Sequence, residues 1–154
     1  MPSRSETSVS KPDGCILTAD WYIYDVLLDA GEWVFATRAS AERFLQAGGG
    51  IVYLTQRGGA FSGLAAEVQA VGNVIEHKVR ASYYLLYPFA VKISILHRPQ
   101  HPIPIKPLLP RLSFVPAGSA WGLAFKGDGC RKIPSPDLAV LRKAIVTAES
   151  ASRG

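Results

Sequence analysis

The chain has 154 residues, of which 48% are hydrophobic and 19% are charged, and its formal net charge is +5. This length suits one domain with a substantial hydrophobic core, and the composition excludes an intrinsically disordered chain. No apolar run approaches the ~20 residues that a membrane-spanning helix needs. The polar first residues lack the apolar stretch of a signal peptide. We therefore expect a cytoplasmic protein without a membrane partner.

Residues 21–28, WYIYDVLL, are rich in aromatic and β-branched side chains and predict a strand. Residues 40–47 follow a capping residue at Thr37 or Ser40 and end at a run of three glycines, residues 48–50. This pattern predicts a short helix. The glycine run lacks the Lys-Ser/Thr of a phosphate loop, which favours a helix C-cap followed by a turn.

Residues 51–55 and 61–71 predict two strands, and the sequence QRGGA at 56–60 has the chemistry of a hairpin turn between them. Residues 72–88 contain three tyrosines and predict an irregular loop. The alternating segment 89–96 predicts a further strand.

Residues 97–110 contain five prolines, which predict a stiff extended segment with one helical turn near Leu108. Ser135, Pro136 and Asp137 then have the pattern of a helix start. Together these elements predict an α+β fold, built as a small mixed β-barrel or strongly curved sheet with flanking short helices. We expect residues 15–147 to form the domain, between a disordered tail (1–14) and a flexible C-terminus (148–154).

Positive charge is concentrated in one part of the chain. Between His77 and Lys126 there is no Asp or Glu, and seven Lys and Arg residues give this segment a formal charge of +7, against −2 for the rest. Such a distribution predicts a surface that meets phosphates, although a solvated basic face is the alternative.

Little in the sequence points to a metal, a cofactor or catalysis. Cys15 and Cys130 have no Cys or His at metal-ligand spacing, and free thiols are favoured over a disulfide in a reducing compartment. His97 and His101 are four residues apart, but the prolines between them exclude a helix that would align them. We therefore predict no metal site, no cofactor and no catalytic residue.

Aromatic residues add a second signal beside the basic segment. Trp33 lies in the short connection Gly31-Glu-Trp-Val-Phe35, where it either anchors the core or stacks on a planar ligand. Trp121 lies in a glycine-containing loop, and Tyr83 and Tyr84 precede the strand at 89–96. Rings like these hold unstacked bases, with about 1–3 kcal/mol for each stacked base.

Several segments, in this order, resemble those of EVE domains over residues 20–146. The segments are Trp33, Arg38–Leu45, Tyr53–Thr55, Phe61–Gly63, Ala66–Val68, Tyr87–Ile93, Pro102–Phe114, Trp121-Gly122 and Arg131–Pro134 with the helix that follows. EVE domains belong to the PUA-like group and are similar to YTH domains, which read methylated adenine in RNA.

The resemblance implies a pocket for a modified base, such as a methylated adenine or methylcytosine, in DNA or RNA. It implies that Trp33 forms one wall of the pocket and that Trp121 either closes its rim or packs the loop. The second wall would come from Tyr83, Tyr84 or Leu85. The floor would come from Phe61, Ser62 and Gly63, with a hydroxyl from Ser62 or Thr55 on the base edge.

We expect the flanking phosphates to be contacted by four basic residues near the predicted pocket, namely Arg38, Arg57, Lys78 and Arg80. A separate effector protein is a further expected partner. Two alternatives remain open at this point. One is a PUA-like hydrolase of modified nucleosides that uses Thr55, Glu67 and Lys92. The other is a protein-interaction module that docks its partner on residues 97–110.

Overall fold

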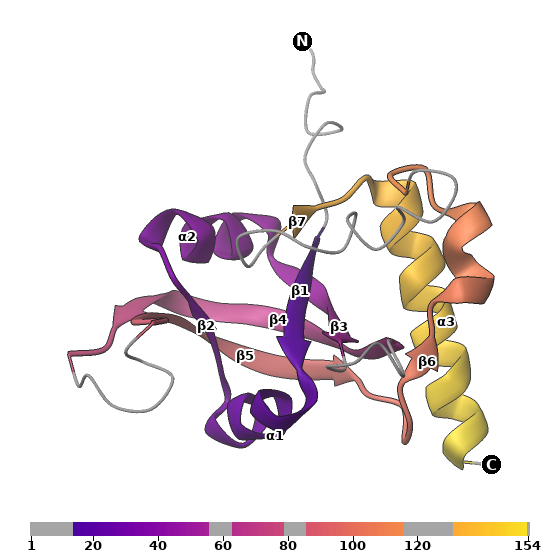
Figure 1. The fold of residues 1–154 in the computed structure, drawn as a ribbon, viewed down its shortest axis with the longest axis horizontal. Helices are drawn as coiled ribbons and strands as arrows, with labels where there is room; N and C mark the ends of the chain where they lie inside the picture. Colours follow the sequence, from indigo (N-terminus) through magenta and orange to yellow (C-terminus); the bar gives the residue numbers. More distant parts are fainter. Residues whose placement is uncertain (1–13, 56–62, 79–85, 116–130, 154) are drawn as a thin grey trace, which may run out of the picture.

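The computed structural model describes residues 14–55, 63–78, 86–115 and 131–153 (Figure 1). In chain order the elements are β1 (Cys15–Asp20), α1 (Trp21–Ala30), β2 (Glu32–Phe35), α2 (Arg38–Ala47), β3 (Gly49–Thr55), β4 (Gly63–Glu76), β5 (Phe89–His97), β6 (Ile103–Pro104), the 3-10 helix η3 (Lys106–Arg111), β7 (Arg131–Lys132) and α3 (Ser135–Arg153). Among the described residues, no helix is both long enough and apolar enough to cross a bilayer.

The strands form one mixed sheet in the order β2-β5-β4-β3-β1-β7, and β6 adds to it by pairing with β4. β1 pairs with β3 in parallel, whereas the other pairings are antiparallel. Figure 1 shows α3 and η3 together at one side of the molecule, with α1 and α2 away from them. The predicted α+β fold around a curved sheet is confirmed.

The two core clusters of the described residues correspond to these two groups of helices. One cluster includes Leu27 of α1, Phe44 of α2 and Trp33 of β2. The other includes Leu141 and Ile145 of α3. β3 contributes to both clusters, because Val52 and Leu54 belong to the first whereas Ile51 and Tyr53 belong to the second. Successive side chains of β3 therefore point to opposite faces of the sheet, and both faces are buried.

The prediction of a strand at residues 21–28 is wrong, because these residues belong to helix α1. Tyr24 and Leu27 are buried and Leu28 is half-buried, whereas Asp25 and Val26 are exposed. This one-sided pattern has a helical period, and packing on the sheet outweighs the strand preference of the individual residues. The helix is followed by Gly31, whose positive φ of 72° favours glycine.

Helix α2 confirms the helix predicted at 40–47. The Thr37 hydroxyl caps it by accepting a hydrogen bond from the Ser40 amide at 3.2 Å. Gly48 ends it in the left-handed conformation, with φ 86°. The turn expected after this cap is absent, because Gly49 and Gly50 already belong to β3.

Strand β4 runs past the end predicted at residue 71, so the loop predicted at 72–88 begins too early. The register with β5 shifts between Val71 and Ile75, and Gly72 lies in this irregularity with φ 80°. Gly72 therefore lies in a β-bulge, and the strand continues beyond it. The strand predicted at 89–96 is confirmed by β5.

The proline-rich segment 97–110 contains the short strand β6 and the helix η3, as predicted from its extended and helical parts. Helix α3 continues to Arg153, so the expected domain end at residue 147 lies inside the helix. The Glu149 carboxylate accepts a hydrogen bond from the backbone amide of Arg98 at 2.9 Å, and its other oxygen lies 3.0 Å from Nδ1 of His97. These contacts connect the last part of α3 with the end of β5.

Candidate base-binding site

Two of the predicted pocket residues lie at one end of the sheet. Leu54 of β3 is opposite Gly63 of β4, which places Thr55 beside the start of β4. The parallel strand β1 ends here too, since Asp20 pairs with Thr55. Gly63 is buried and also pairs with Pro104 of β6. The structure therefore brings Thr55 and Gly63 together, as the predicted hairpin required.

Trp33 lies on strand β2, so the prediction of a short connection over residues 31–35 is wrong. It pairs with Val91 of β5, and only 2% of the residue is exposed. It belongs to the same core cluster as Leu54 and Ala65, which flank the sheet end described above. Trp33 is therefore a core residue in this structure.

Two of the predicted phosphate contacts, Arg38 and Lys78, lie at the other end of β4. Arg38 is 3.4 Å from Glu76 and 5.1 Å from the centroid of the Phe89 ring, and Lys78 is 3.9 Å from the same Glu76 carboxylate oxygen. Their side chains are 50% and 85% exposed. The 14 residues of β4 separate this cluster from Gly63, on the order of 40 Å along the strand. The structure does not bring the two groups together.

A contact between a histidine and a carboxylate connects this second end with the strand of Trp33. The Nε2 atom of His77 lies 3.0 Å from Glu32 Oε1, and the two side chains are 24% and 12% exposed. Glu32 precedes Trp33 in β2, and His77 follows the last residue of β4. The contact holds the edge strand β2 across β5, which lies between β2 and β4.

Most of the predicted site lies outside the described residues. This applies to eight positions: Arg57, Phe61, Ser62, Arg80, Tyr83, Tyr84, Leu85 and Trp121. The predicted hairpin turn at 56–60 and Cys130 lie outside them as well. The role of these residues in base binding stays a prediction.

Sequence reasoning did not single out Arg98, which lies with Tyr24 near the Gly63 end. Its guanidinium is 5.3 Å from the centroid of the Tyr24 ring and 3.4 Å from Asp25. These residues line a small cavity of about 80 Å³ together with Ala65 of β4. Burial raises the pKa of the Tyr24 phenol, and the positive charge of Arg98 partly opposes this rise. The phenol oxygen makes no hydrogen bond among the described residues.

The residues named for a hydrolase are not assembled in the described part of the chain. Glu67 is buried on β4, where Arg142 of α3 donates to its carboxylate. Lys92 is exposed on β5. The described residues contain no group of three or more His, Cys, Asp or Glu side chains that would hold a metal ion. The Cys15 thiol is buried.

No protein-family model and no curated protein matches this chain. Solved structures do match in fold. The YTH domain of Zygosaccharomyces rouxii MRB1 protein, in complex with N6-methyladenosine RNA, matches 91% of this chain and 86% of its own with a TM-score of 0.59 and 12% identity. The YTH domain of Pho92, in complex with m6A, matches 91% and 87% with a TM-score of 0.61 and 11% identity.

A third similar structure is the Toxoplasma CPSF4-YTH domain in its apo form. It matches 94% of this chain and 93% of its own, with a TM-score of 0.56 and 11% identity. The chain therefore has a YTH-like fold along nearly its whole length. At these identities the likeness establishes the fold alone.

Proposed function

We propose that this chain is a reader module that binds RNA and recognises one methylated base, with N6-methyladenine as the first candidate. The observation that carries the proposal is the fold, which the chain shares over about nine-tenths of its length with one domain described in complex with N6-methyladenosine RNA and another in complex with m6A. Placement of Trp33 on the strand after α1, and of Thr55 beside the start of β4, agrees with a pocket between these elements. Because several segments resemble those of EVE domains, we also propose that the chain is related to that family. DNA is tested as a ligand beside RNA.

The mechanism starts with one nucleotide leaving its stack, which costs a few kcal/mol. Stacking on the Trp33 ring offsets about 1–3 kcal/mol of this cost. Because Trp33 is 2% exposed, moving the groups that cover it costs free energy and reduces this gain. A methyl group on the base then adds apolar contact, worth about 0.8 kcal/mol for each buried carbon. The proposed selectivity for a methylated base arises in this last step.

Phosphate binding in this proposal involves two groups of described cations. Arg98 lies near the Gly63 end of the sheet, whereas Arg38 and Lys78 lie at the Glu76 end. A strand of RNA that contacts both groups would run along the sheet. Affinity would then fall with added salt, since each phosphate neutralised releases counterions.

The experiment that tests the proposal is a titration of the full chain, followed by tryptophan fluorescence, with a panel of short oligonucleotides. The panel contains RNA and DNA of one sequence, each with a plain, N6-methyl or 5-methyl base at its centre. We expect one modified RNA to bind several-fold more tightly than its plain counterpart. Equal affinity across the panel would contradict the proposal and leave the basic segment as an electrostatic surface only.

A further inference from the structure

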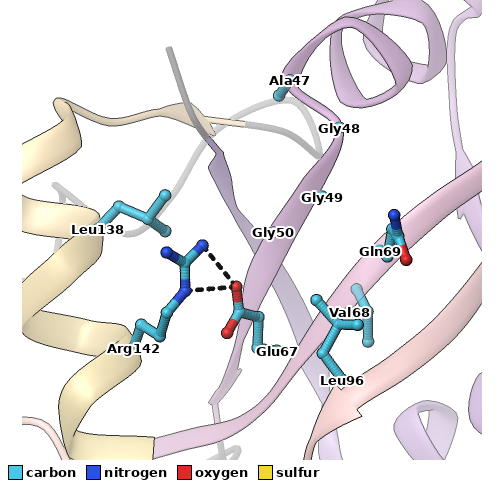
Figure 2. Close-up of a pocket in the computed structure, with 10 residues that line it drawn as sticks. All are labelled: Ala47, Gly48, Gly49, Gly50, Glu67, Val68, Gln69, Leu96, Leu138 and Arg142. Atoms are coloured by element: carbon cyan, nitrogen blue, oxygen red, sulfur yellow. Dashed lines mark hydrogen bonds and ion pairs between the residues drawn. The ribbon is translucent and has the colours of Figure 1, made fainter.

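A larger cavity, of about 260 Å³, lies between helix α3 and the strands β3 and β4. Figure 2 shows Leu138 and Arg142 of α3 on one side of it and the start of β3 on the other, with Glu67 between them. Leu96 of β5 completes the apolar part of the lining. None of these residues belongs to the predicted base-binding site. Glu67 is one of the three residues of the alternative hydrolase.

One carboxylate in this cavity has an oxygen with no partner. Arg142 Nε donates to Glu67 Oε2 at 2.8 Å, and Arg142 Nη2 forms an ion pair with the same oxygen at 2.7 Å. Glu67 Oε1 is buried and makes no hydrogen bond among the described residues, and the side chain is 5% exposed. A buried carboxylate oxygen left without a donor costs about 1–3 kcal/mol, and native structures supply a partner for nearly all such groups.

At the start of β3 the cavity is lined by the backbone of Gly49 and Gly50. Strand packing alone explains why these two positions are glycine. A Cβ atom on Gly49 would lie 2.5 Å from the carbonyl oxygen of Val68, and one on Gly50 would lie 2.8 Å from that of Cys15. Only glycine allows neighbouring strands to approach this closely. As a consequence, no side chain from these two positions fills the space in front of Glu67.

We propose that this cavity is a second binding site, for a compact neutral molecule or group whose N–H donates to Glu67 Oε1. Primary carboxamides and exocyclic amino groups of nucleobases have this chemistry, and carboxylates are known to accept from the amino group of cytosine. The apolar side chains of Leu96 and Leu138 would pack against the remainder of the ligand. The cavity lies just below the usual 300–1,000 Å³ of ligand pockets, which favours a small ligand.

Charge selects a neutral ligand over an ionic one. Glu67 and Arg142 already form a pair with no net charge. A cation drawn to the Glu67 carboxylate would be repelled by the guanidinium of Arg142, and an anion drawn to Arg142 would be repelled by Glu67, so neither gains a net attraction from the pair. A neutral donor satisfies Glu67 Oε1 without either repulsion.

The test maps amide chemical shifts of the ¹⁵N-labelled full chain while small probes are added at millimolar concentrations. Nicotinamide and cytidine supply the N–H donor, and methyl nicotinate has the ring of nicotinamide without any N–H. We expect saturable shifts at residues 48–50 and 67–69 with at least one donor probe, and binding at least about tenfold weaker for the ester. If neither donor probe shifts these amides, the cavity holds water only and the proposal is wrong.

Two substitutions on neighbouring residues of β5 locate the site. Leu96 and Ile95 are 45% and 43% exposed, but only Leu96 lines the cavity, since consecutive strand residues point to opposite faces. Leu96→Trp should fill the cavity and abolish probe binding, whereas Ile95→Trp should leave it unchanged. Probe binding that survives Leu96→Trp would overturn the proposal.

Glu67→Gln gives the chemical test of the oxygen itself. A carboxamide at this position can donate where the carboxylate only accepts, so the variant should lose its preference for nicotinamide over the ester. An unchanged preference would overturn the role of Glu67. Binding of methylated RNA is measured on the Leu96→Trp variant in parallel, and we expect no change there. Failure of this second site is thereby distinguishable from failure of the reader function.

Discussion

Trp33 lies directly opposite Val91, in the antiparallel pairing of β2 with β5, and only 2% of it is exposed. The residue proposed to stack on the base is therefore also part of the hydrophobic core. Its substitution affects stability and recognition together, and the two effects have to be separated.

We expect Trp33→Ala to destabilise the fold by about 3–5 kcal/mol, because it leaves a cavity in the core. It should also remove the preference for methylated over plain RNA. Phe44→Ala is the matched control, since Phe44 is fully buried in the same cluster but lies on α2. Chemical denaturation gives the stability of both variants, and oligonucleotide titration gives the ratio of affinities. A preference retained in Trp33→Ala would remove this ring from the pocket.

Glu76 lies within 4 Å of both Arg38 and Lys78, at 3.4 and 3.9 Å. Glu76→Gln removes this competing anion, so RNA affinity at low salt should rise a few-fold if the two cations contact phosphates. Glu42→Gln, on the exposed surface of α2, changes the net charge by the same amount and is the control. Equal gains in the two variants would indicate a long-range charge effect and not a contact at this end of the sheet.

The pKa of Tyr24 is raised above its ordinary value of 10.0, mainly by burial. Above about pH 10 the phenol ionises first in the unfolded chain, so the contribution of Tyr24 to the free energy of unfolding is complete below that pH and is lost as the pH rises. Tyr24→Phe should weaken this alkaline loss of stability. At neutral pH it should cost little, since the phenol oxygen makes no hydrogen bond among the described residues. Denaturation of both proteins between pH 7 and 11 tests this, and parallel alkaline curves would contradict it.

Arg142→Ala leaves the carboxylate of Glu67 buried without its donor. We expect a loss of about 2–4 kcal/mol of stability, below the upper range for buried pairs because the Arg142 side chain is 46% exposed. The same substitution in a Glu67→Gln background should cost much less, since no buried charge remains. Lys143→Ala, at the next and exposed position of α3, is the control. Similar costs of Arg142→Ala in the two backgrounds would show that packing of the arginine, and not its charge, stabilises the fold.

Elements with local signals could be predicted from the sequence. Helix α2 begins at the Thr37 cap and ends at Gly48, and both signals act within one turn of the chain. Helix α1 is also followed by a glycine with positive φ, Gly31, but its aromatic residues favour a strand when considered alone. Its one-sided burial of Tyr24 and Leu27 depends on the sheet beneath it, which no local pattern reveals.

The same distinction applies to the sites. The closeness of Thr55 and Gly63 followed from one predicted hairpin, because the two strands pair side by side. Glu67 and Arg142 are 75 residues apart in sequence, and only the packing of α3 on the sheet brings them together. The buried position of Trp33 likewise depends on the pairing of β2 with β5, which had not been predicted.

The proposed function of this fold is to read a methylated base in RNA. Its most direct test is isothermal titration of the full chain with two RNA strands that differ only by one N6-methyl group on an adenine, at two salt concentrations. We expect weaker binding of both strands at higher salt, with a several-fold preference for the methylated strand that persists at both concentrations. Equal affinity of the two strands, at either salt concentration, would contradict it.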